Sequence, residues 1–421
     1  MELKSIIKEQ REELETIEKT EGFIKREKLA EAEELLKFPN ILVVLGVRRC
    51  GKSIFSYLLS KNHNMGYINF DDERIADIKG KELNKVLESF YELYGDIDYI
   101  VLDEIQNIES WELFASRLRR TKKVILTGSN SKLLSGELAA HLTGRYIDIK
   151  LHPFSFKEFL LKKGFGTNST YTTKEKSRLI NLLREYLQVG GFPETHKFGK
   201  IIIPRIYDDI LTKDILLRHR INKIEELKKI AKYLITNSAQ EFTYSKLAHT
   251  FNVKHISTVS NWVTYLENSF LIFRLERFDF KLKQQFIAPK KIFCVDCGLM
   301  NMIGFNFSEN IGRVIENEVA IELQRRNIIK NPLQYYYWKD YQHNEVDFVI
   351  KDGKKIIQLI QVSYVTDKEY IKEREISSLT KASRELRCNN LLMITWDYET
   401  EAMFEGKKIK FLPLWKWLLM N

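Results

Sequence analysis

The stretch that decides the fold runs from Ile41 to Ser60 and reads ILVVLGVRRCGKSIFSYLLS. A strand-like apolar run comes first, then a short segment bounded by glycines, then an amphipathic run of helical type. The segment GVRRCGKS fits G-x-x-x-x-G-K-[ST] at every fixed position. The glycines let the backbone curl until successive N–H groups point inward, and the following helix adds its positive end. The stretch therefore predicts a loop that binds phosphate groups.

The loop and the first helical turn share the task of holding the phosphates. Lys52 supplies positive charge to the β and γ phosphates of a nucleoside triphosphate, and the Ser53 hydroxyl is a ligand for Mg²⁺. ATP is the expected nucleotide. The predicted binding residues are Gly46, Val47, Arg48, Arg49, Cys50, Gly51, Lys52, Ser53 and Ile54.

A second site is predicted in DYIVLDEIQN, where an apolar strand ends in Asp103 and Glu104. Ligands of open α/β sheets bind at the carboxyl ends of the strands, so this pair is expected to face the phosphates. Asp103 would hold the hydrated Mg²⁺, and Glu104 would polarise the attacking water as general base. The alternative interpretation is that this pair of acids lies in an ordinary surface turn.

Two further residues are candidates for catalysis. Asn130 follows the next strand, KVILTGSNS, and could reach the water or the γ-phosphate; ordinary turn chemistry is the alternative. Arg145, in LTGRYIDI, could neutralise charge developing on the γ-phosphate, either in cis or from a neighbouring subunit of a homo-oligomer. A surface salt bridge is the alternative for Arg145.

Composition limits the class of protein. The chain has 421 residues, is 44% hydrophobic and 29% charged, and carries a net charge of +10. These fractions indicate soluble globular domains, and no apolar run approaches the roughly 18–20 residues that span a bilayer. The charged start has no signal-peptide pattern, so we expect a cytoplasmic protein without membrane contact. Cys294 and Cys297 have the spacing of zinc ligands but no second pair, which favours structural thiols.

Changes of pattern divide the chain into five regions. Residues 1–37 are predicted to be helical, and 38–152 alternate strands and helices as in a parallel sheet covered on both faces. Residues 153–204 form a predicted helical lid that ends near VGGFPE. Residues 205–285 are helical and basic, and 286–421 return to mixed strands and helices. The fold class is therefore α/β, with a P-loop sheet followed by three further regions.

The basic region has the cadence of a helix–turn–helix. Apolar residues mark two helical faces on either side of an Asn-Val turn, and the strand-like FLIFRLERFDF that follows suggests a winged variant. Between residues 201 and 300 there are 16 Lys and Arg against 10 Asp and Glu. This excess favours DNA as a partner, although winged helices also act as packing modules. Exposed candidates for contact are Lys254, His255, Ser257, Thr258 and Asn261.

The last region contains the outline of a metal site. Glu316 lies in a helical segment, Asp347 in the strand-like NEVDFVI, and Gln361 one hairpin later in IIQLIQVSY. An acid on a strand followed after a hairpin by (D/E/Q)-x-K is the Mg²⁺ layout of restriction-type nucleases. Here Ser363 stands where that layout has lysine, and serine lacks its charge. The sequence thus predicts a vestigial nuclease site rather than an active one.

Taken together, these blocks resemble archaeal and bacterial AAA-type P-loop ATPases that carry a C-terminal restriction-endonuclease-like domain of unassigned function. The blocks that carry the resemblance occur in the same order: GVRRCGKS, NFDDERI, VLDEIQN, LTGSNS, LTGRYIDIKLHPFSFKEF, VGGFPE, RIYDDILTKDIL, IFCVDCGL, GRVIEN and NEVDFVI. The resemblance implies an ATPase core, a small helical region, a winged helix and a nuclease-like tail, with the roles given above to Lys52, Ser53, Asp103 and Glu104.

The expected function is Mg²⁺-dependent ATP binding and hydrolysis in a DNA-associated protein, with the nucleotide state controlling engagement of the partner. Two alternatives remain at this stage: a nucleotide-gated switch that binds protein without DNA, and an ATP-dependent nuclease. The serine in place of the nuclease lysine disfavours the second.

Overall fold

The chain, described by a computed structural model over residues 3–131, 142, 144–167, 170–304 and 311–420, divides into two compact units. The first unit comprises Met1–Pro153 with Asn268–Phe270, and the second comprises Phe154–Glu267 with Leu271–Asn421.

The first unit is built on a five-stranded parallel sheet in the order β2-β3-β4-β1-β5. Its strands are β1 (Ile41–Leu45), β2 (Met65–Asn69), β3 (Tyr99–Asp103), β4 (Lys123–Gly128) and β5 (Tyr146–Lys150). All five lie within residues 38–152, which were predicted to alternate strands and helices. Because β4 lies between β1 and β3, the loops that follow these three strands are neighbours at the carboxyl edge of the sheet.

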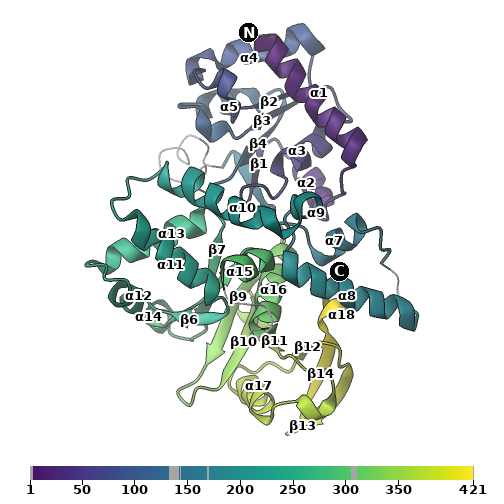
Figure 1. Ribbon diagram of the computed structural model, residues 1–421, viewed down its shortest axis with the longest axis vertical. Helices are drawn as coiled ribbons and strands as arrows, with labels where there is room; N and C mark the ends of the chain where they lie inside the picture. Colours follow the sequence, from purple (N-terminus) through teal and green to yellow (C-terminus); the bar gives the residue numbers. More distant parts are fainter. Residues whose placement is uncertain (1–2, 132–141, 143, 168–169, 305–310, 421) are drawn as a thin grey trace. The chain divides into compact units, whose positions relative to one another are not determined.

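Helices cover both faces of this sheet (Figure 1). Alternate strand residues such as Val43 pack in a core with α1 and α4, and the intervening ones face α3 on the other side. Residues 1–37 were expected to be helical, and the described part of this segment contains two helices separated by residues 22–28. The helical elements are α1 (Leu3–Glu21), α2 (Leu29–Leu35), α3 (Lys52–Ser60), α4 (Leu83–Tyr94) and α5 (Glu112–Leu118), with short 3₁₀ turns η1 (Glu73–Ile75), η2 (Gly80–Glu82) and η3 (Ile105–Asn107).

The second unit begins with helices, as the sequence predicts for residues 153–204. The proline–glycine segment ends α8, where Gly190 takes a positive φ of 76°. Its helical elements are α7 (Phe156–Lys162), α8 (Thr173–Val189), α9 (Thr195–Phe198), η5 (Gly199–Ile202), α10 (Ile203–Asp209), η6 (Ile210–Leu216), α11 (Ile224–Thr236), α12 (Tyr244–Thr250), α13 (Ile256–Asn268), α14 (Leu282–Ile287), α15 (Cys297–Ile303), α16 (Ile311–Arg326), η8 (Lys368–Tyr370), α17 (Glu373–Glu385) and α18 (Leu414–Leu419).

A nine-stranded mixed sheet runs through the second unit, in the order β13-β14-β12-β11-β10-β9-β7-β8-β6 (Figure 1). Helix α17 packs against β10 and β11, and a second apolar core lies beneath it. The strands are β6 (Gln240–Phe242), β7 (Ile272–Arg277), β8 (Lys290–Cys294), β9 (Gln334–Lys339), β10 (Glu345–Asp352), β11 (Lys355–Val362), β12 (Leu391–Thr395), β13 (Thr400–Phe404) and β14 (Lys407–Pro413).

The boundary expected at residue 285 separates two strands that pair with each other, β7 before it and β8 after it. β8 pairs antiparallel with both β6 and β7, so the three-stranded arrangement that accompanies α11, α12 and α13 extends to Cys294. β7 then pairs in parallel with β9, which joins these strands to the tail in one sheet. The order of residues along the chain does not reveal this pairing, because α14 separates β7 from β8.

Two smaller findings concern membranes and cysteines. Among the described residues, no helix has both the length and the apolar character required to cross a membrane.

Cys294 and Cys297 are both buried, and the Cys297 thiol lies 3.4 Å from a Glu318 oxygen. Burial raises the pKa of Cys294 to about 12, so this thiol stays protonated at neutral pH.

Candidate nucleotide site

The predicted phosphate loop connects β1 to α3 in a tight curl. Gly51 has a φ of 95° and Arg49 one of 66°, so two left-handed residues turn the backbone within three positions. Gly46 has no room for a side chain, because a Cβ there would lie 2.1 Å from the carbonyl oxygen of Leu151. The Cys50 thiol lies 3.3 Å from the same oxygen and is fully buried. The loop is therefore held against the end of β5.

Arg26 fastens the loop from outside the motif. It lies between α1 and α2 and is buried, and its guanidinium donates to the Cys50 carbonyl at 3.0 Å and to the His152 carbonyl at 2.6 Å. One side chain thus links the loop backbone to the segment after β5. Sequence reasoning missed Arg26, because nothing in the charged segment FIKREKL distinguishes it from its neighbours.

Lys52 and Glu104 lie side by side at the carboxyl edge. The Lys52 ammonium lies 3.6 Å from a Glu104 carboxylate oxygen, and both side chains are almost completely buried. Lys52 also donates to the loop carbonyls of Gly46 at 3.1 Å and Val47 at 3.2 Å. The second Glu104 oxygen accepts a hydrogen bond from Gln106. The structure therefore brings together the two residues expected to act on the γ-phosphate.

Glu104 is held in an unusual backbone conformation. Its φ is 52°, which is uncommon for a residue with a side chain, and its N–H donates to the Thr127 hydroxyl at 2.9 Å. The Thr127 hydroxyl in turn donates to Asp103. This turn points the two consecutive acids apart. The Asp103 side chain faces the hydroxyl groups of Tyr67 and Thr127, whereas the Glu104 side chain faces Lys52.

Asp103 is fully buried among hydroxyl groups. Tyr67 donates to it at 2.7 Å, and it is also hydrogen-bonded to Ser53 and Thr127. Burial raises the pKa of the Asp103 carboxyl and the neighbouring charge of Glu104 adds to the rise, whereas these hydrogen bonds oppose it. A carboxylate beside a hydroxyl is a donor pair that suits Mg²⁺, which takes one or two protein ligands plus phosphate oxygens at such sites. The Asp103–Ser53 pair therefore fits the metal predicted for it.

The family comparisons agree with this geometry. A family model described as an AAA domain matches residues 39–160, which contain the loop and all five strands. Over these residues the chain carries an AAA-type P-loop domain. Two models of domains of unknown function, DUF8612 and DUF4143, match residues 180–309 and 311–417.

Curated relatives extend the match over almost the whole chain. The uncharacterized protein MJ1544 of Methanocaldococcus jannaschii is 36% identical over 406 residues, which cover 92% of this chain and 90% of that protein. The chain belongs to the family of MJ1544. An uncharacterized protein of Haemophilus influenzae is 30% identical over 354 residues, covering 79% of this chain and 85% of that protein.

Solved structures show weaker likeness. The Walker-type ATPase PABY2304 of Pyrococcus abyssi has a TM-score of 0.41 at 15% identity, covering 68% of this chain and 97% of that one. The Orc1 protein of Aeropyrum pernix in complex with DNA has a TM-score of 0.28 at 11% identity, covering 68% and 94%. These scores are too low to add to what the loop and the parallel sheet already show.

The two remaining catalytic candidates of the AAA domain lie at opposite edges of its sheet. Asn130 is buried just after β4, level with the phosphate loop. Arg145 precedes β5 and its carbonyl accepts from the N–H of Ile41, so it lies at the amino edge, about 20 Å from the loop at roughly 3.3 Å per residue. Its guanidinium contacts the Ser116 hydroxyl at 3.2 Å. The expected action of Arg145 in cis does not fit this register, and the expectation in trans stays a prediction.

The acids predicted in the tail do converge, around a residue that sequence reasoning missed. Glu316 on α16 and Asp347 on β10 both contact the ammonium of Lys291 on β8, at 2.7 and 3.1 Å. Gln361 on β11 is expected opposite Asp347, since the neighbouring pair is Phe348 with Ile360. Nothing in the run APKKIFCVD indicates that one of its lysines lies among acids of two other elements, α16 and β10.

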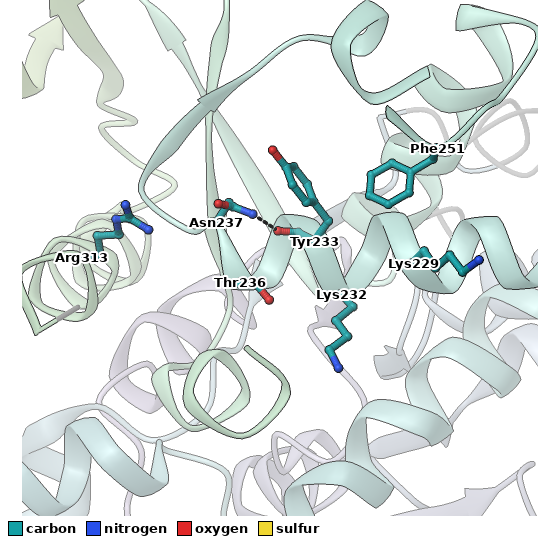
Figure 2. Close-up of a pocket in the computed structure, with 7 residues that line it drawn as sticks. All are labelled: Lys229, Lys232, Tyr233, Thr236, Asn237, Phe251 and Arg313. Atoms are coloured by element: carbon teal, nitrogen blue, oxygen red, sulfur yellow. Dashed lines mark hydrogen bonds between the residues drawn. The ribbon is translucent and has the colours of Figure 1, made fainter. Parts of the chain in front are cut away.

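A basic pocket of about 480 Å³ opens beside α11 (Figure 2). Among the described residues, its lining includes three cationic side chains and no carboxylate. The rings of Tyr233 and Phe251 meet edge to face with centroids 5.4 Å apart, and the Asn237 amide donates to the Tyr233 carbonyl at 2.8 Å. The lining residues are Lys229, Lys232, Tyr233, Thr236, Asn237, Phe251 and Arg313.

Proposed function

We propose that the protein is a Mg²⁺-dependent ATPase whose nucleotide state controls how it engages a partner, and that the partner is DNA. The observation that carries the ATPase half is the placement of Glu104 3.6 Å from the Lys52 ammonium, beside the Asp103–Ser53 pair. A loop that only held phosphate would need no buried carboxylate at this point. Activation of the attacking water requires a general base, and the Glu104 carboxylate beside Lys52 can act as that base.

Each residue has a separate task in the proposed hydrolysis. Lys52 exchanges its two loop carbonyls for phosphate oxygens and so neutralises charge on the γ-phosphate. Glu104 accepts a proton from water as the water oxygen bonds to the γ-phosphorus and the bond to the β–γ bridging oxygen breaks. Gln106 holds the second Glu104 oxygen in place. Mg²⁺ bound through Ser53 and Asp103 would neutralise the β and γ phosphates.

The test is steady-state ATP hydrolysis by the full chain, with Mg²⁺ and with excess EDTA. Glu104→Gln should lower kcat by about 100-fold or more while nucleotide binding persists, because loss of a general base typically costs this much. Glu109→Gln, the same change at an exposed residue nearby, should leave the rate unaltered. Hydrolysis that survives Glu104→Gln or EDTA would contradict the ATPase half.

The DNA half rests on charge and arrangement in the second unit. Support for a winged helix comes from α12 and α13, which follow each other across a short turn, and from the antiparallel strands β6, β8 and β7 of the same region. Lys254, His255, Ser257 and Asn261 are exposed there, and Thr258 is half-buried. The basic pocket supplies further cations, together with aromatic rings of the kind on which bases stack.

DNA binding should therefore be salt-dependent, since each cation that contacts a phosphate releases counterions. Replacing Lys229 and Lys232 with Gln should weaken binding to duplex and single-stranded DNA and reduce the slope of log K against log salt by about 2. Lys85→Gln on an exposed face of the first unit is the matched control. Binding that is absent, or independent of salt, would remove DNA from the proposal.

A protein partner is the second candidate, and one observation favours it. The segment around α14 exposes four large apolar side chains, Phe280, Leu282, Phe286 and Ile287, each more than 60% accessible. Exposed apolar clusters mark interaction sites more often than chance. If hydrolysis depends on Glu104 but ignores DNA, this segment is the first surface to examine.

We further propose that the tail has a restriction-endonuclease-like fold without nuclease activity. The support is the hairpin of β10 and β11, which carries Asp347 and Gln361 on opposed positions, with Glu316 on the preceding helix. No cleavage of DNA or RNA should occur with Mg²⁺ or Mn²⁺. Metal-dependent cleavage that disappears in Asp347→Asn would overturn this part.

A further inference from the structure

A buried ammonium occupies the centre of the acidic cluster in the second unit. The Nζ of Lys291 lies 2.7 Å from a Glu316 oxygen, 2.6 Å from a Glu345 oxygen and 3.1 Å from an Asp347 oxygen. An ammonium has three N–H donors, so each is matched by one carboxylate. Three carboxylates in contact with one ammonium favour its charged form.

The other oxygens of these strand acids are also committed to donors of the protein. The second Asp347 oxygen accepts from the Val362 N–H at 2.9 Å, and the second Glu345 oxygen lies 3.0 Å from the Lys339 ammonium. Mg²⁺ needs oxygen ligands at about 2.0–2.1 Å and would lie against a fixed positive charge. Within the described part of the chain, no group of three acidic, His or Cys side chains is arranged to hold a metal. The metal implied by the nuclease-like layout does not fit the residues as they stand.

The sequence departs from the nuclease layout at Gln361 and Ser363. Both departures agree with a site that holds a lysine ammonium where the layout has a divalent metal. Gln361 is neutral where the layout allows an acid, so it adds no fourth carboxylate to Glu316, Glu345 and Asp347. Ser363 carries no charge where the layout has lysine. The Gln361 Oε1 and the Ser363 hydroxyl are buried, and neither makes a hydrogen bond within the described residues. Gln361 thus keeps an oxygen that could serve as a ligand.

We propose that Lys291 is a built-in cation that takes the place of the divalent metal, so that this site binds no divalent ion in the native protein. Removing the ammonium leaves the contacting oxygens of Glu316, Glu345 and Asp347 around an emptied position, which then accepts a metal. The inference builds on the nuclease-like layout but not on ATP hydrolysis, so the two can fail separately.

Terbium luminescence on the full, nucleotide-free chain tests the proposal. The Tyr337 ring centroid lies 5.7 Å from the Lys291 Nζ, so Tb³⁺ in place of the ammonium would be sensitised by excitation of this tyrosine. Tyr337→Phe in each background isolates that signal from Tb³⁺ bound elsewhere, including the nucleotide site. The native chain should give no emission that depends on Tyr337, whereas Lys291→Ala should gain it. Mn²⁺ should raise the Tm of Lys291→Ala and leave the native Tm unchanged.

Three uncompensated carboxylates could prevent Lys291→Ala from folding. The double variant Lys291→Ala with Glu345→Gln removes one of these negative charges and retains the carboxylates of Glu316 and Asp347. Emission from the native chain that disappears with Tyr337→Phe overturns the proposal, because a metal then binds beside the lysine. A folded single or double variant that gains neither the emission nor the Mn²⁺-dependent rise in Tm also overturns it.

Discussion

Replacing Arg26 tests whether the phosphate loop is held in shape from outside its own motif. Arg26→Met keeps the aliphatic stem but removes the two hydrogen bonds to the carbonyls of Cys50 and His152, at 3.0 and 2.6 Å. A hydrogen bond from a charged donor contributes about 1.5–3 kcal/mol. Losing two should destabilise the loop by about 3 kcal/mol or more, which equals about a 100-fold increase in local opening.

Two assays measure this change. Hydrogen–deuterium exchange should become about 100-fold faster in the peptide that contains the loop, with little change in the second unit. The KM for ATP should rise, because the loop must first return to the binding shape. Arg120→Met, at an exposed position of the same unit, is the control and should change neither quantity. Unaltered exchange in Arg26→Met would refute the reasoning, and faster exchange with an unchanged KM would show that the clamp serves stability alone.

Three further predictions concern single positions. Gly46→Ala should abolish ATP binding, since the new Cβ would lie 2.1 Å from the carbonyl that follows β5, whereas Gly166→Ala, which meets nothing within 4 Å, should not; equilibrium binding of labelled ATP measures both. If Arg145 acts in trans, mixing Arg145→Ala with Lys52→Ala should restore ATPase activity that neither variant has alone; activity that does not rise on mixing, or with protein concentration, removes Arg145 from the site. Burial raises the pKa of Glu318 from 4.5 to about 7, so the native state binds its proton more tightly than the unfolded state does. The free energy of unfolding should then fall by up to about 1.4 kcal/mol per unit as pH rises from 4.5 to 7, and Glu318→Gln should flatten this part of the urea-denaturation profile; an unchanged slope would contradict the assignment.

The nucleotide site was largely predictable because its signals are local. The loop pattern fixes glycine, lysine and serine within eight residues, and the apolar runs on either side fix strand and helix. Asp103 and Glu104 could be placed at the same edge because parallel strands all end on one side. The structure adds the left-handed turn at Glu104, which separates the two acids into different environments.

Arg145 shows where residue type misleads. An arginine just before a strand has the right charge for the γ-phosphate, but the pairing of Ile41 with Tyr146 puts it at the amino edge of the sheet. Register is a property of two strands, and no pattern within one of them contains it.

Sequence alone thus determined the parallel sheet, the phosphate loop and the pair of acids that face it, because each depends on residues that are neighbours in the chain or on the common direction of the strands. Only the tertiary structure decided that Arg26 clamps the loop and that Lys291 gathers acids from α16 and β10. Both are charged side chains buried by elements distant in sequence, and a buried charge acquires its role from the partners that compensate it. Those partners are known only once the chain has folded.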